Sequence, residues 1–103
     1  MIGVDIVKIN RFANKSDYFV RRILSNRELN YYNQQIDIDS KTRVLASIWA
    51  IKEAIFKADN QYASFQKIEL EHTDKGWKNQ DFDISISHDE DAGILIAFVI
   101  KKR

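Results

Sequence analysis

Residues 44–58 read VLASIWAIKEAIFKA, and this stretch decides the fold. Its only charged residues are Lys52, Glu53 and Lys57, and neither proline nor glycine interrupts it. A helix that is apolar on nearly every side lies buried, either in the core of its own chain or against neighbouring chains. We therefore expect one long buried helix through 44–58 that ends near Asp59-Asn60.

The segments before and after this helix have the two-residue period of strands. Residues 2–9 are mostly β-branched, and their alternation places Asp5 on the face opposite Ile2, Val4 and Ile6. Residues 65–72 and 82–88 also alternate, with a turn near 74–76. Residues 92–100 are almost entirely apolar, which predicts a strand covered on both faces.

Two shorter helices are expected between the first strand and the long helix. Asn10 offers an N-cap to a helical stretch running towards Ser25, with an interruption at 14–17. Ser25 and Glu28 have the spacing of a capping box, which predicts a second helix through Tyr32, followed by a polar connection over 33–40.

These elements predict an α+β fold: an N-terminal strand, helices including one long buried helix, then an antiparallel sheet, in a single domain over 1–103. A domain this small buries only about 60–65% of the surface of its unfolded chain, so its own core is modest. It has no cysteine, which excludes disulfide and thiolate-metal stabilisation. An apolar strand and a nearly all-apolar helix are a lot to bury in so short a chain, so we expect a homo-oligomer. No apolar run is typical of a signal peptide or a membrane span, so we expect a cytoplasmic location and no membrane partner.

The net charge is only +1, but the charges are unevenly distributed. The segment 8–22 is basic, and the segment 81–91 contains carboxylates without lysine or arginine. A basic segment on a near-neutral chain favours an acidic partner, because local charge steers encounter. Nucleic acid, a membrane surface, an acidic protein or simply a solvated helix face are all compatible with this pattern.

Asp5 and Glu53 are carboxylates within apolar segments, where an unpaired charge is costly. One interpretation pairs Glu53 with Lys57 one helical turn on, but such a pair adds only about 0.2–0.5 kcal/mol to a helix. The other interpretation brings Asp5 and Glu53 together around Mg²⁺, which prefers oxygen ligands and substrate phosphates. Lys57 and Lys52 would then be the phosphate partners.

His88 ends an alternating strand, either as an edge residue or as a contact for a phosphate. The acidic residues that follow it would favour the imidazolium form and would also repel a phosphate. Other types of site lack the residues they need. Two histidines without cysteine do not make a zinc site, and three isolated glycines do not make a phosphate-binding loop. Ser85 and Ser87 lack a nucleophile-elbow pattern.

Three motifs in order resemble the 4′-phosphopantetheinyl transferase family. The first two are Gly3-Val4-Asp5 and Trp49-Ala50-Ile51-Lys52-Glu53-Ala54-Ile55-Phe56-Lys57, which are similar to that family's Gly-x-Asp strand and its Trp/Phe-x-x-Lys-Glu-x-x-x-Lys helix. The third, Ser85-Ile86-Ser87-His88, resembles the Ser-x-Ser-His strand of the short, holo-acyl-carrier-protein synthase branch. The segment from Arg22 to Tyr32 also resembles that branch, so the likeness extends over nearly the whole chain.

The resemblance implies a function and assigns roles to residues. It implies transfer of 4′-phosphopantetheine from coenzyme A to a serine of acyl carrier protein in fatty acid biosynthesis, with Mg²⁺ bound by Asp5 and Glu53 and with 3′,5′-ADP released. It implies that Lys57 acts in catalysis beside these two carboxylates. The residues that it places at coenzyme A are Lys57, Lys52, Ser87 and His88. Those that it places at the acidic carrier protein are Arg11, Lys15, Arg21 and Arg22.

The resemblance also implies a homotrimer with active sites between subunits, and no nucleic-acid partner. Two departures affect the nucleotide end: residues 59–64 lack the glycines of related loops, and Ile48 stands where relatives can have arginine. The alternative function is a non-catalytic relative that binds a carrier protein or nucleotide. A structural oligomer with ion-paired carboxylates is a third.

Overall fold

The computed structural model describes all residues, 1–103. Its elements in chain order are strand β1 (Ile2–Lys8), a 3-10 turn (Ile9–Phe12), helices α1 (Asp17–Ile23), α2 (Asn26–Gln34) and α3 (Ile38–Ala58), a second 3-10 turn (Phe65–Lys67), and strands β2 (Glu71–Thr73), β3 (Gly76–Lys78), β4 (Phe82–Asp89) and β5 (Ile94–Lys101). Helices grouped before an antiparallel sheet define the α+β class predicted from the sequence.

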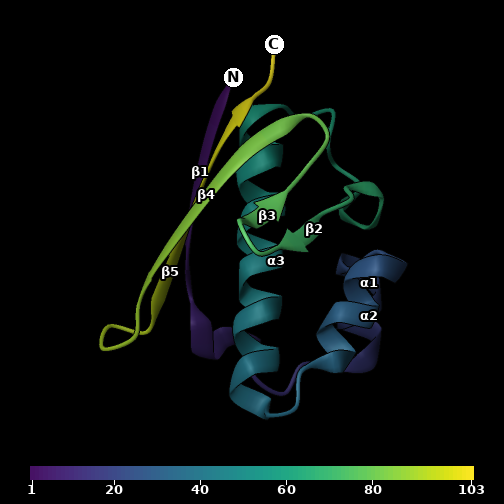
Figure 1. The fold of residues 1–103 in the computed structure, drawn as a ribbon, viewed down its shortest axis with the longest axis vertical. Coiled ribbons are helices and arrows are strands. Elements are labelled where there is room, and N and C mark those ends of the chain that lie inside the picture. Colours follow the sequence, from purple (N-terminus) through teal and green to yellow (C-terminus); the bar gives the residue numbers. More distant parts are fainter.

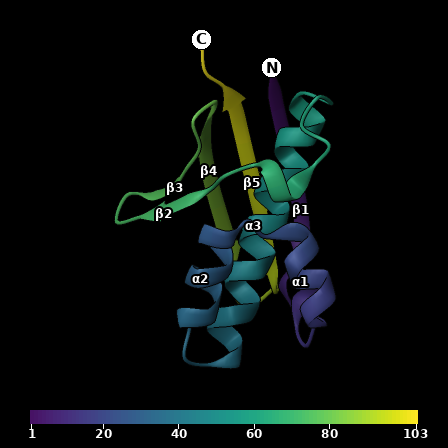
Figure 2. The same ribbon diagram turned by 90° about the vertical axis from the view of Figure 1, so that its right-hand side faces the viewer.

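The main sheet has the strand order β1–β5–β4, and both pairs of strands are antiparallel. The first strand therefore pairs with the last, and Asp5 lies opposite Ala97. Figure 1 shows this sheet along one side of α3, with α1 and α2 on the other side. In Figure 2, α1 and α2 lie in front of the lower half of α3, and the β2–β3 hairpin projects to one side. Helix α3 is thus the centre of the domain.

Helix α3 is longer than the sequence predicts. It begins at Ile38 rather than near 44, because the Asp37 side chain caps it and accepts a hydrogen bond from the Ser40 backbone N–H at 2.7 Å. The polar connection predicted over 33–40 is correspondingly short. The predicted capping box of α2 is present, with the Ser25 and Glu28 side chains each bonded to the other's backbone N–H. The predicted interruption is present at residues 13–16, where Asn14 has a positive φ of 57°. The predicted N-cap at Asn10 is wrong: Asn10 lies within the 3-10 turn, and Ser16 caps α1.

A close approach of backbones joins β1 to α3. A Cβ atom added at Gly3 would lie 1.8 Å from the carbonyl oxygen of Ala54, so only glycine fits at this position. The small residues Ala54 and Ala58 form the helix surface at this contact. This contact fixes the position of Asp5, two residues along the same face of β1, relative to the last turns of α3.

The strand predicted over 65–72 is wrong. Residues 65–67 form a 3-10 turn, and only Glu71–Thr73 pairs as a short strand, with β3. Ile68 and Leu70 are buried, which accounts for the alternation in the sequence. The Leu70 N–H, however, donates to the Glu28 carboxylate at 2.7 Å rather than to a neighbouring strand. The Glu28 side chain on α2 thus takes the place of the cross-strand hydrogen bond that the alternating pattern predicts for Leu70.

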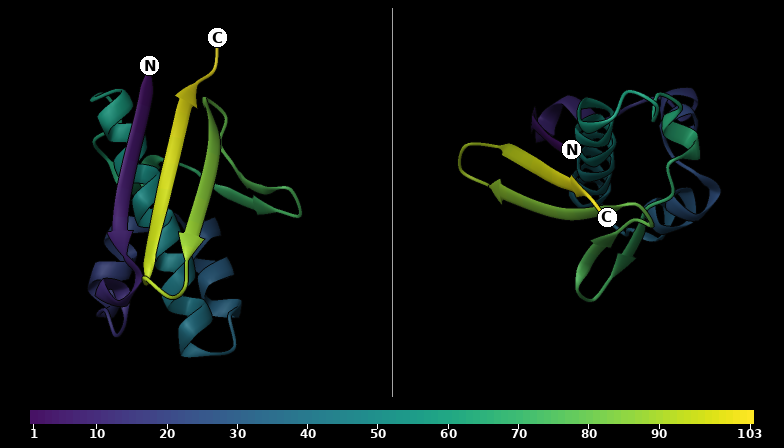
Figure 3. Two further views of the ribbon diagram at one scale, coloured as in Figure 1. Left: turned by 90° about the vertical axis from the view of Figure 1, so that its left-hand side faces the viewer. Right: turned by 90° about the horizontal axis from the view of Figure 1, so that it is seen from above.

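Strand β5 is covered by α3 on only one face. Leu95, Ala97 and Val99 are buried, whereas the alternate residues are 38–43% exposed, so the predicted cover on both faces is absent within one chain. The exposed residues of β5 align with those of β1 in an apolar surface, which we call the outer sheet face; its members are Ile2, Val4, Ile6, Ile96, Phe98 and Ile100. The left view of Figure 3 looks onto this side of the sheet with α3 behind it, and the right view, from above, shows α3 end-on beside the sheet. None of the helices combines the length and the apolar character needed to span a bilayer.

Candidate active site

Asp5 and Lys57 meet where β1 packs against the end of α3. Lys57 Nζ lies 2.7 Å from Asp5 Oδ1, and it also donates to the Val4 carbonyl at 3.3 Å. The Asp5 side chain is only 11% exposed, whereas that of Lys57 is 50% exposed. Asp5 Oδ2 is buried and has no hydrogen-bond partner, the one such side-chain atom in the structure. A buried carboxylate oxygen without a partner is costly, and the cost is removed when a ligand binds there.

Glu53 lies on the same side of α3 as Lys57. Trp49, Glu53 and Lys57 are four residues apart, so they form a row along one face of the helix. Glu53 immediately precedes Ala54, whose carbonyl contacts Gly3 of β1. The Glu53 carboxylate forms no ion pair, and Lys57 bonds to Asp5 instead, so the simple Glu53–Lys57 pair considered from the sequence is absent.

The carboxylates of Asp5 and Glu53 have the donor chemistry that a magnesium ion prefers. Both offer hard oxygen ligands, and Mg²⁺ in proteins is commonly bound by one or two carboxylates together with substrate phosphates. The unpartnered Oδ2 of Asp5 is an acceptor available for such an ion. No cluster of three or more potential metal-ligating side chains occurs.

The prediction that Lys52 contacts a phosphate is wrong. Its side chain is fully buried, and its ammonium donates to Glu28 Oε1 at 2.6 Å and to the carbonyls of Ile23 and Phe65 at 2.8 and 2.7 Å. Burial raises the pKa of the Glu28 carboxyl and lowers the pKa of the Lys52 ammonium, while the attraction between the two charges opposes both changes. Lys52 is therefore part of the interior. The sequence indicated Glu28 only as a capping residue, and its role as the partner of Lys52 was missed.

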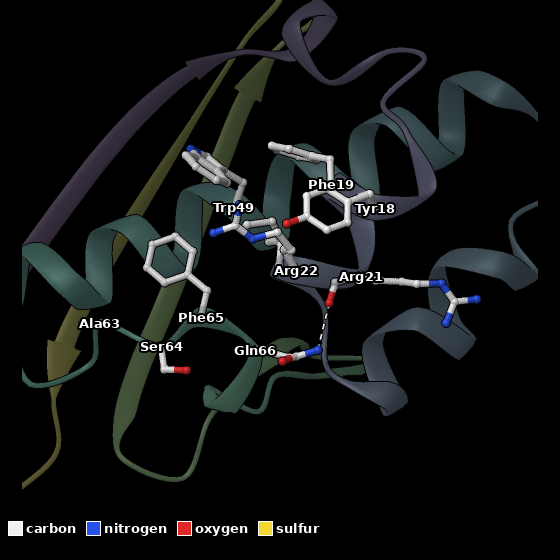
Figure 4. A pocket seen from close by; sticks show the side chains of 10 residues that line it. Tyr18, Phe19, Arg21, Arg22, Trp49, Ala63, Ser64, Phe65 and Gln66 are labelled. Carbon is white, nitrogen blue, oxygen red and sulfur yellow. Dashed lines mark hydrogen bonds between the residues drawn. The ribbon is translucent and has the colours of Figure 1, made fainter.

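A pocket of about 730 Å³ lies between α1, α3 and the segment that follows α3. Its aromatic lining residues are Tyr18, Phe19, Trp49 and Phe65, and Arg21 and Arg22 also line it. In Figure 4 the aromatic side chains and Arg22 surround the pocket, with the Trp49 ring near those of Phe19 and Phe65, whereas the Arg21 side chain extends away from it. The Trp49 and Phe65 rings are in edge-to-face contact, with centroids 5.6 Å apart. We call this the aromatic pocket; its aromatic residues were not predicted as site residues.

The four basic residues predicted to bind a carrier protein all lie around the aromatic pocket. The Arg11 guanidinium stacks over Phe12 and Trp49, at 4.8 and 5.5 Å from the ring centroids. Lys15 lies 5.0 Å from the Phe19 ring, and Arg21 and Arg22 line the pocket itself. Arg21 also forms an ion pair with Asp17 at 2.8 Å. These four residues therefore form a basic rim at an apolar pocket, next to the row of Trp49, Glu53 and Lys57.

The residues predicted at the nucleotide end lie away from this cluster within one chain. Ser87 and His88 are on β4, at the opposite edge of the sheet from Asp5 on β1. Two strand spacings separate these edges, which is about 10 Å. The side chain of Ser87 points to the outer sheet face, because Ser87 pairs with Ile96. His88 Nε2 is 3.9 Å from Glu90 Oε1, and Glu90 also pairs with Arg43 at 3.6 Å. A single chain does not bring His88 to Asp5.

The comparison with known proteins defines the family. Residues 1–99 match the model of the 4′-phosphopantetheinyl transferase superfamily, so the chain belongs to this superfamily. Its curated relatives include a holo-(acyl-carrier-protein) synthase of Mycoplasma mobile, 49% identical over 102 residues that cover 99% of this chain and 89% of the relative. Another, from Mycoplasmopsis pulmonis, is 50% identical over 101 residues that cover 98% and 89%.

A solved structure also matches. A holo-(acyl-carrier-protein) synthase from Bacillus anthracis, in complex with CoA (3′,5′-ADP), has a TM-score of 0.81 and 30% identity and covers 97% of this chain and 93% of that chain. These likenesses confirm the family, the fold and the enzyme class that the sequence motifs predict: the protein is a transferase of the holo-acyl-carrier-protein synthase type.

Proposed function

We propose that this enzyme transfers 4′-phosphopantetheine from coenzyme A to a serine of apo-acyl carrier protein, with Mg²⁺, for fatty acid biosynthesis. The observation that carries the proposal is the Asp5 carboxylate: it is buried beside Lys57, and one of its oxygens has no partner. The serine oxygen forms a new ester bond to the β-phosphorus of coenzyme A. The phosphoanhydride bond breaks, 3′,5′-ADP leaves with the bonding electrons, and the proton of the serine hydroxyl passes to solvent.

Asp5 and Glu53 would hold the magnesium ion, which when bound neutralises charge that develops on the phosphates. Lys57 is half exposed, so its ammonium can turn from Asp5 to a phosphate oxygen. Positioning and neutralisation of charge supply most of the catalysis in phosphoryl transfer. Asp5 on β1, with Glu53 and Lys57 on α3, would provide this positioning and neutralisation without a covalent intermediate.

The basic rim and the aromatic pocket are the proposed docking site for the carrier protein. Acyl carrier proteins are acidic, and Arg11, Lys15, Arg21 and Arg22 provide the opposite charge around an apolar pocket. Trp49 lies in the pocket and is one helical turn from Glu53. A carrier docked here would thus present its serine close to the end of α3 that carries the catalytic row.

The proposed oligomer is a homotrimer with active sites between subunits. The outer sheet face consists of six apolar side chains, 38–62% exposed, in adjacent register on β1 and β5. A contiguous apolar patch of this kind is typical of an interface between proteins. Ser87 and His88 lie at the far edge of the same sheet, so a neighbouring subunit could supply them to the nucleotide end.

The decisive experiment incubates apo-carrier protein with coenzyme A and Mg²⁺ and measures addition of phosphopantetheine by mass spectrometry. We expect Asp5→Asn and Glu53→Gln each to lower kcat/KM by about 10²–10³-fold, the usual cost of losing one group that stabilises developing charge. The matched controls are Asp74→Asn and Glu71→Gln, exposed carboxylates of the β2–β3 hairpin, which should retain activity. No transfer by the unaltered enzyme would refute the function, and unchanged transfer by Asp5→Asn would refute the site.

A further inference from the structure

Lys52 is the most tightly enclosed charge in the molecule. An ammonium has three N–H donors, and here each has its own acceptor: Glu28 Oε1, the Ile23 carbonyl and the Phe65 carbonyl. All three N–H groups are therefore bonded to protein acceptors, and none is left for a ligand. Lys52 nevertheless lies next in sequence to Glu53 of the proposed active site.

Two of these acceptors belong to opposite walls of the aromatic pocket. Ile23 is the last residue of α1, and Phe65 begins the 3-10 turn of the segment after α3; both line the pocket. The buried Lys52 ammonium thus links the two walls through hydrogen bonds to one carbonyl in each. A second, exposed link joins them at the surface, where the Gln66 side-chain amide donates to the Arg21 carbonyl at 2.9 Å. This bond is the dashed line in Figure 4.

Glu28 extends the connection to the rest of the segment after α3. Its Oε1 accepts from the Ser25 backbone N–H at 2.9 Å, and its Oε2 accepts from that of Leu70 at 2.7 Å. Residues 59–70 form no strand, so their position depends on such individual contacts. The Lys52 ammonium thus holds the wall at Phe65, and its partner Glu28 holds the same segment five residues further on, at Leu70.

We infer that Lys52, with Glu28, is a positioning residue that sets the separation of the two walls of the carrier-docking pocket, and that Lys52 has no contact with coenzyme A. The inference rests on the proposed function of the pocket. A buried ion pair can often be exchanged for apolar side chains without loss of stability, so stability alone does not explain its presence. The bonds to two facing carbonyls give it a geometric role that an apolar side chain lacks.

The test uses the double variant Lys52→Met/Glu28→Gln. Lys52→Met alone leaves a charged Glu28 unpaired in the interior, which strongly destabilises a protein, whereas the double change leaves no buried charge. We expect the double variant to fold and its KM for the carrier protein to rise by about tenfold or more, since small misplacements of docking groups are costly. Its KM for coenzyme A and its Mg²⁺ dependence should stay unchanged.

Two further variants complete the test. Gln66→Ala changes an exposed side chain and leaves no buried group unpaired, so this variant should fold normally. It should also raise the KM for the carrier protein, but by a smaller factor than the double variant does. The matched control is the double variant Lys101→Met/Asp59→Asn, because Lys101→Met alone would leave the buried Asp59 carboxylate unpaired. The control removes the ion pair between Lys101 Nζ and Asp59 Oδ2, which lie 2.8 Å apart at the start of the same segment. Neither residue lines the aromatic pocket. The KM of this control for the carrier should be unchanged.

Amide hydrogen exchange provides a readout that needs no activity. In the double variant, the amides of Ile68 and Leu70 should exchange faster, while those of β1 and β5 stay protected. Unchanged exchange at these two amides would overturn the inference. So would a rise in the KM for coenzyme A without a rise for the carrier. If the unaltered enzyme modifies no carrier protein, the proposed function fails, and the exchange pattern alone decides whether Lys52 positions the segment.

Discussion

Lys57 Nζ on helix α3 lies 2.7 Å from Asp5 Oδ1 on strand β1, while the second oxygen of the same carboxylate is buried without a partner. The ion pair therefore satisfies one oxygen of the Asp5 carboxylate and leaves the other oxygen available to a ligand. The cation at this position also competes with any metal ion for Asp5. Lys57 consequently has two opposite effects, since it competes with the metal and attracts the phosphates.

Lys57→Gln should separate these two effects. Without the competing ammonium, Mg²⁺ should bind the free protein more tightly, whereas the KM for coenzyme A should rise by about tenfold because a charge-assisted hydrogen bond is lost. Isothermal titration with MgCl₂ and steady-state kinetics measure the two quantities. Lys75→Gln, in the exposed hairpin turn, makes the same change of charge and should alter neither. Weaker Mg²⁺ binding in Lys57→Gln would instead indicate that Lys57 orients Asp5.

Gly3→Ala should damage both stability and activity. The added methyl group would lie 1.8 Å from the Ala54 carbonyl oxygen, so β1 would have to move away from α3. Overpacking of this kind costs about 1–3 kcal/mol, and here it would also displace Asp5. Urea unfolding and the transfer assay measure the two losses. Gly93→Asn is the control: Gly93 has a φ of +69°, which asparagine tolerates, and no atoms lie near its Cβ position. A Gly3→Ala variant with full stability would contradict the close packing of β1 on α3.

The limits of sequence reasoning are clearest at the two lysines of α3. Both lie close to Glu53 in an apolar helix, and the sequence motif predicts a phosphate contact for both. At 100° per residue they lie about 140° apart around the helix axis, so they cannot face the same ligand. The helical period alone separates Lys52 from the row of Trp49, Glu53 and Lys57. It does not reveal which of these faces meets β1, because that depends on Gly3, far away in the sequence.

The segment 65–72 shows a second limit. Ile68 and Leu70 alternate with polar residues as in a strand, but their backbone is held by side chains from elsewhere in the fold. Strand β4 and the capping box of α2, in contrast, were predicted correctly, because their hydrogen bonds are local or follow a regular ladder. The sequence therefore predicted the long helix, the capping box and β4, whereas the metal-binding roles of Asp5 and Glu53 stay predictions. Long-range side-chain acceptors such as Glu28 appear only in the folded structure.

The Asp59–Lys101 pair should make stability depend on pH at both ends of the range. The hydrogen bond from Lys101 holds the pKa of the Asp59 carboxyl below its ordinary value, and the same bond raises the pKa of the Lys101 ammonium. Asp59 thus contributes stability that is present above the ordinary aspartate pKa and is lost as the pH falls through its lowered pKa. Lys101 contributes stability that is present below the ordinary lysine pKa and is lost as the pH rises through its raised pKa.

The full contribution should therefore appear between about pH 4 and pH 10. The measurement is the difference in urea midpoint between the unaltered protein and Asp59→Asn, followed across this range and to more acidic pH. We expect the difference to be constant near neutrality and to vanish in acid. Asp74→Asn, at an exposed turn, should show no such dependence. A difference that persists below the lowered pKa of Asp59 would contradict the pairing.

Reversing the charge of Arg11 should impair use of the carrier protein selectively. Its guanidinium lies over the Phe12 and Trp49 rings at the edge of the aromatic pocket, where an acidic partner would meet it. Arg11→Glu should raise the KM for the carrier by about 10–100-fold, because juxtaposed like charges cost several kcal/mol. The KM for coenzyme A should hardly change. Arg27→Glu, on the exposed start of α2 outside the pocket, is the control. Equal effects on both substrates would refute a docking role for Arg11.

The last prediction concerns the outer sheet face, where Val4 and Phe98 are cross-strand neighbours. Both side chains point away from α3, so Val4→Glu and Phe98→Glu should leave the core intact while placing a charge in the proposed interface. We expect each to convert a trimer into a monomer in analytical ultracentrifugation at micromolar concentration, with unchanged circular dichroism and loss of transfer. The control is Ile36→Glu, which changes an exposed apolar residue outside this face and should stay trimeric. A stable monomer of the unaltered protein would contradict the proposal.

Complementation then tests whether the active sites lie between subunits. Asp5 is at one edge of the sheet and His88 at the other, so a shared site would combine Asp5 of one subunit with His88 of its neighbour. Asp5→Asn and His88→Ala should each be impaired alone. When the two are mixed, dissociated and reassembled, some interfaces contain both unaltered residues, and activity should partly return. If each site were complete within one chain, every chain in the mixture would carry one defect and no activity would be regained.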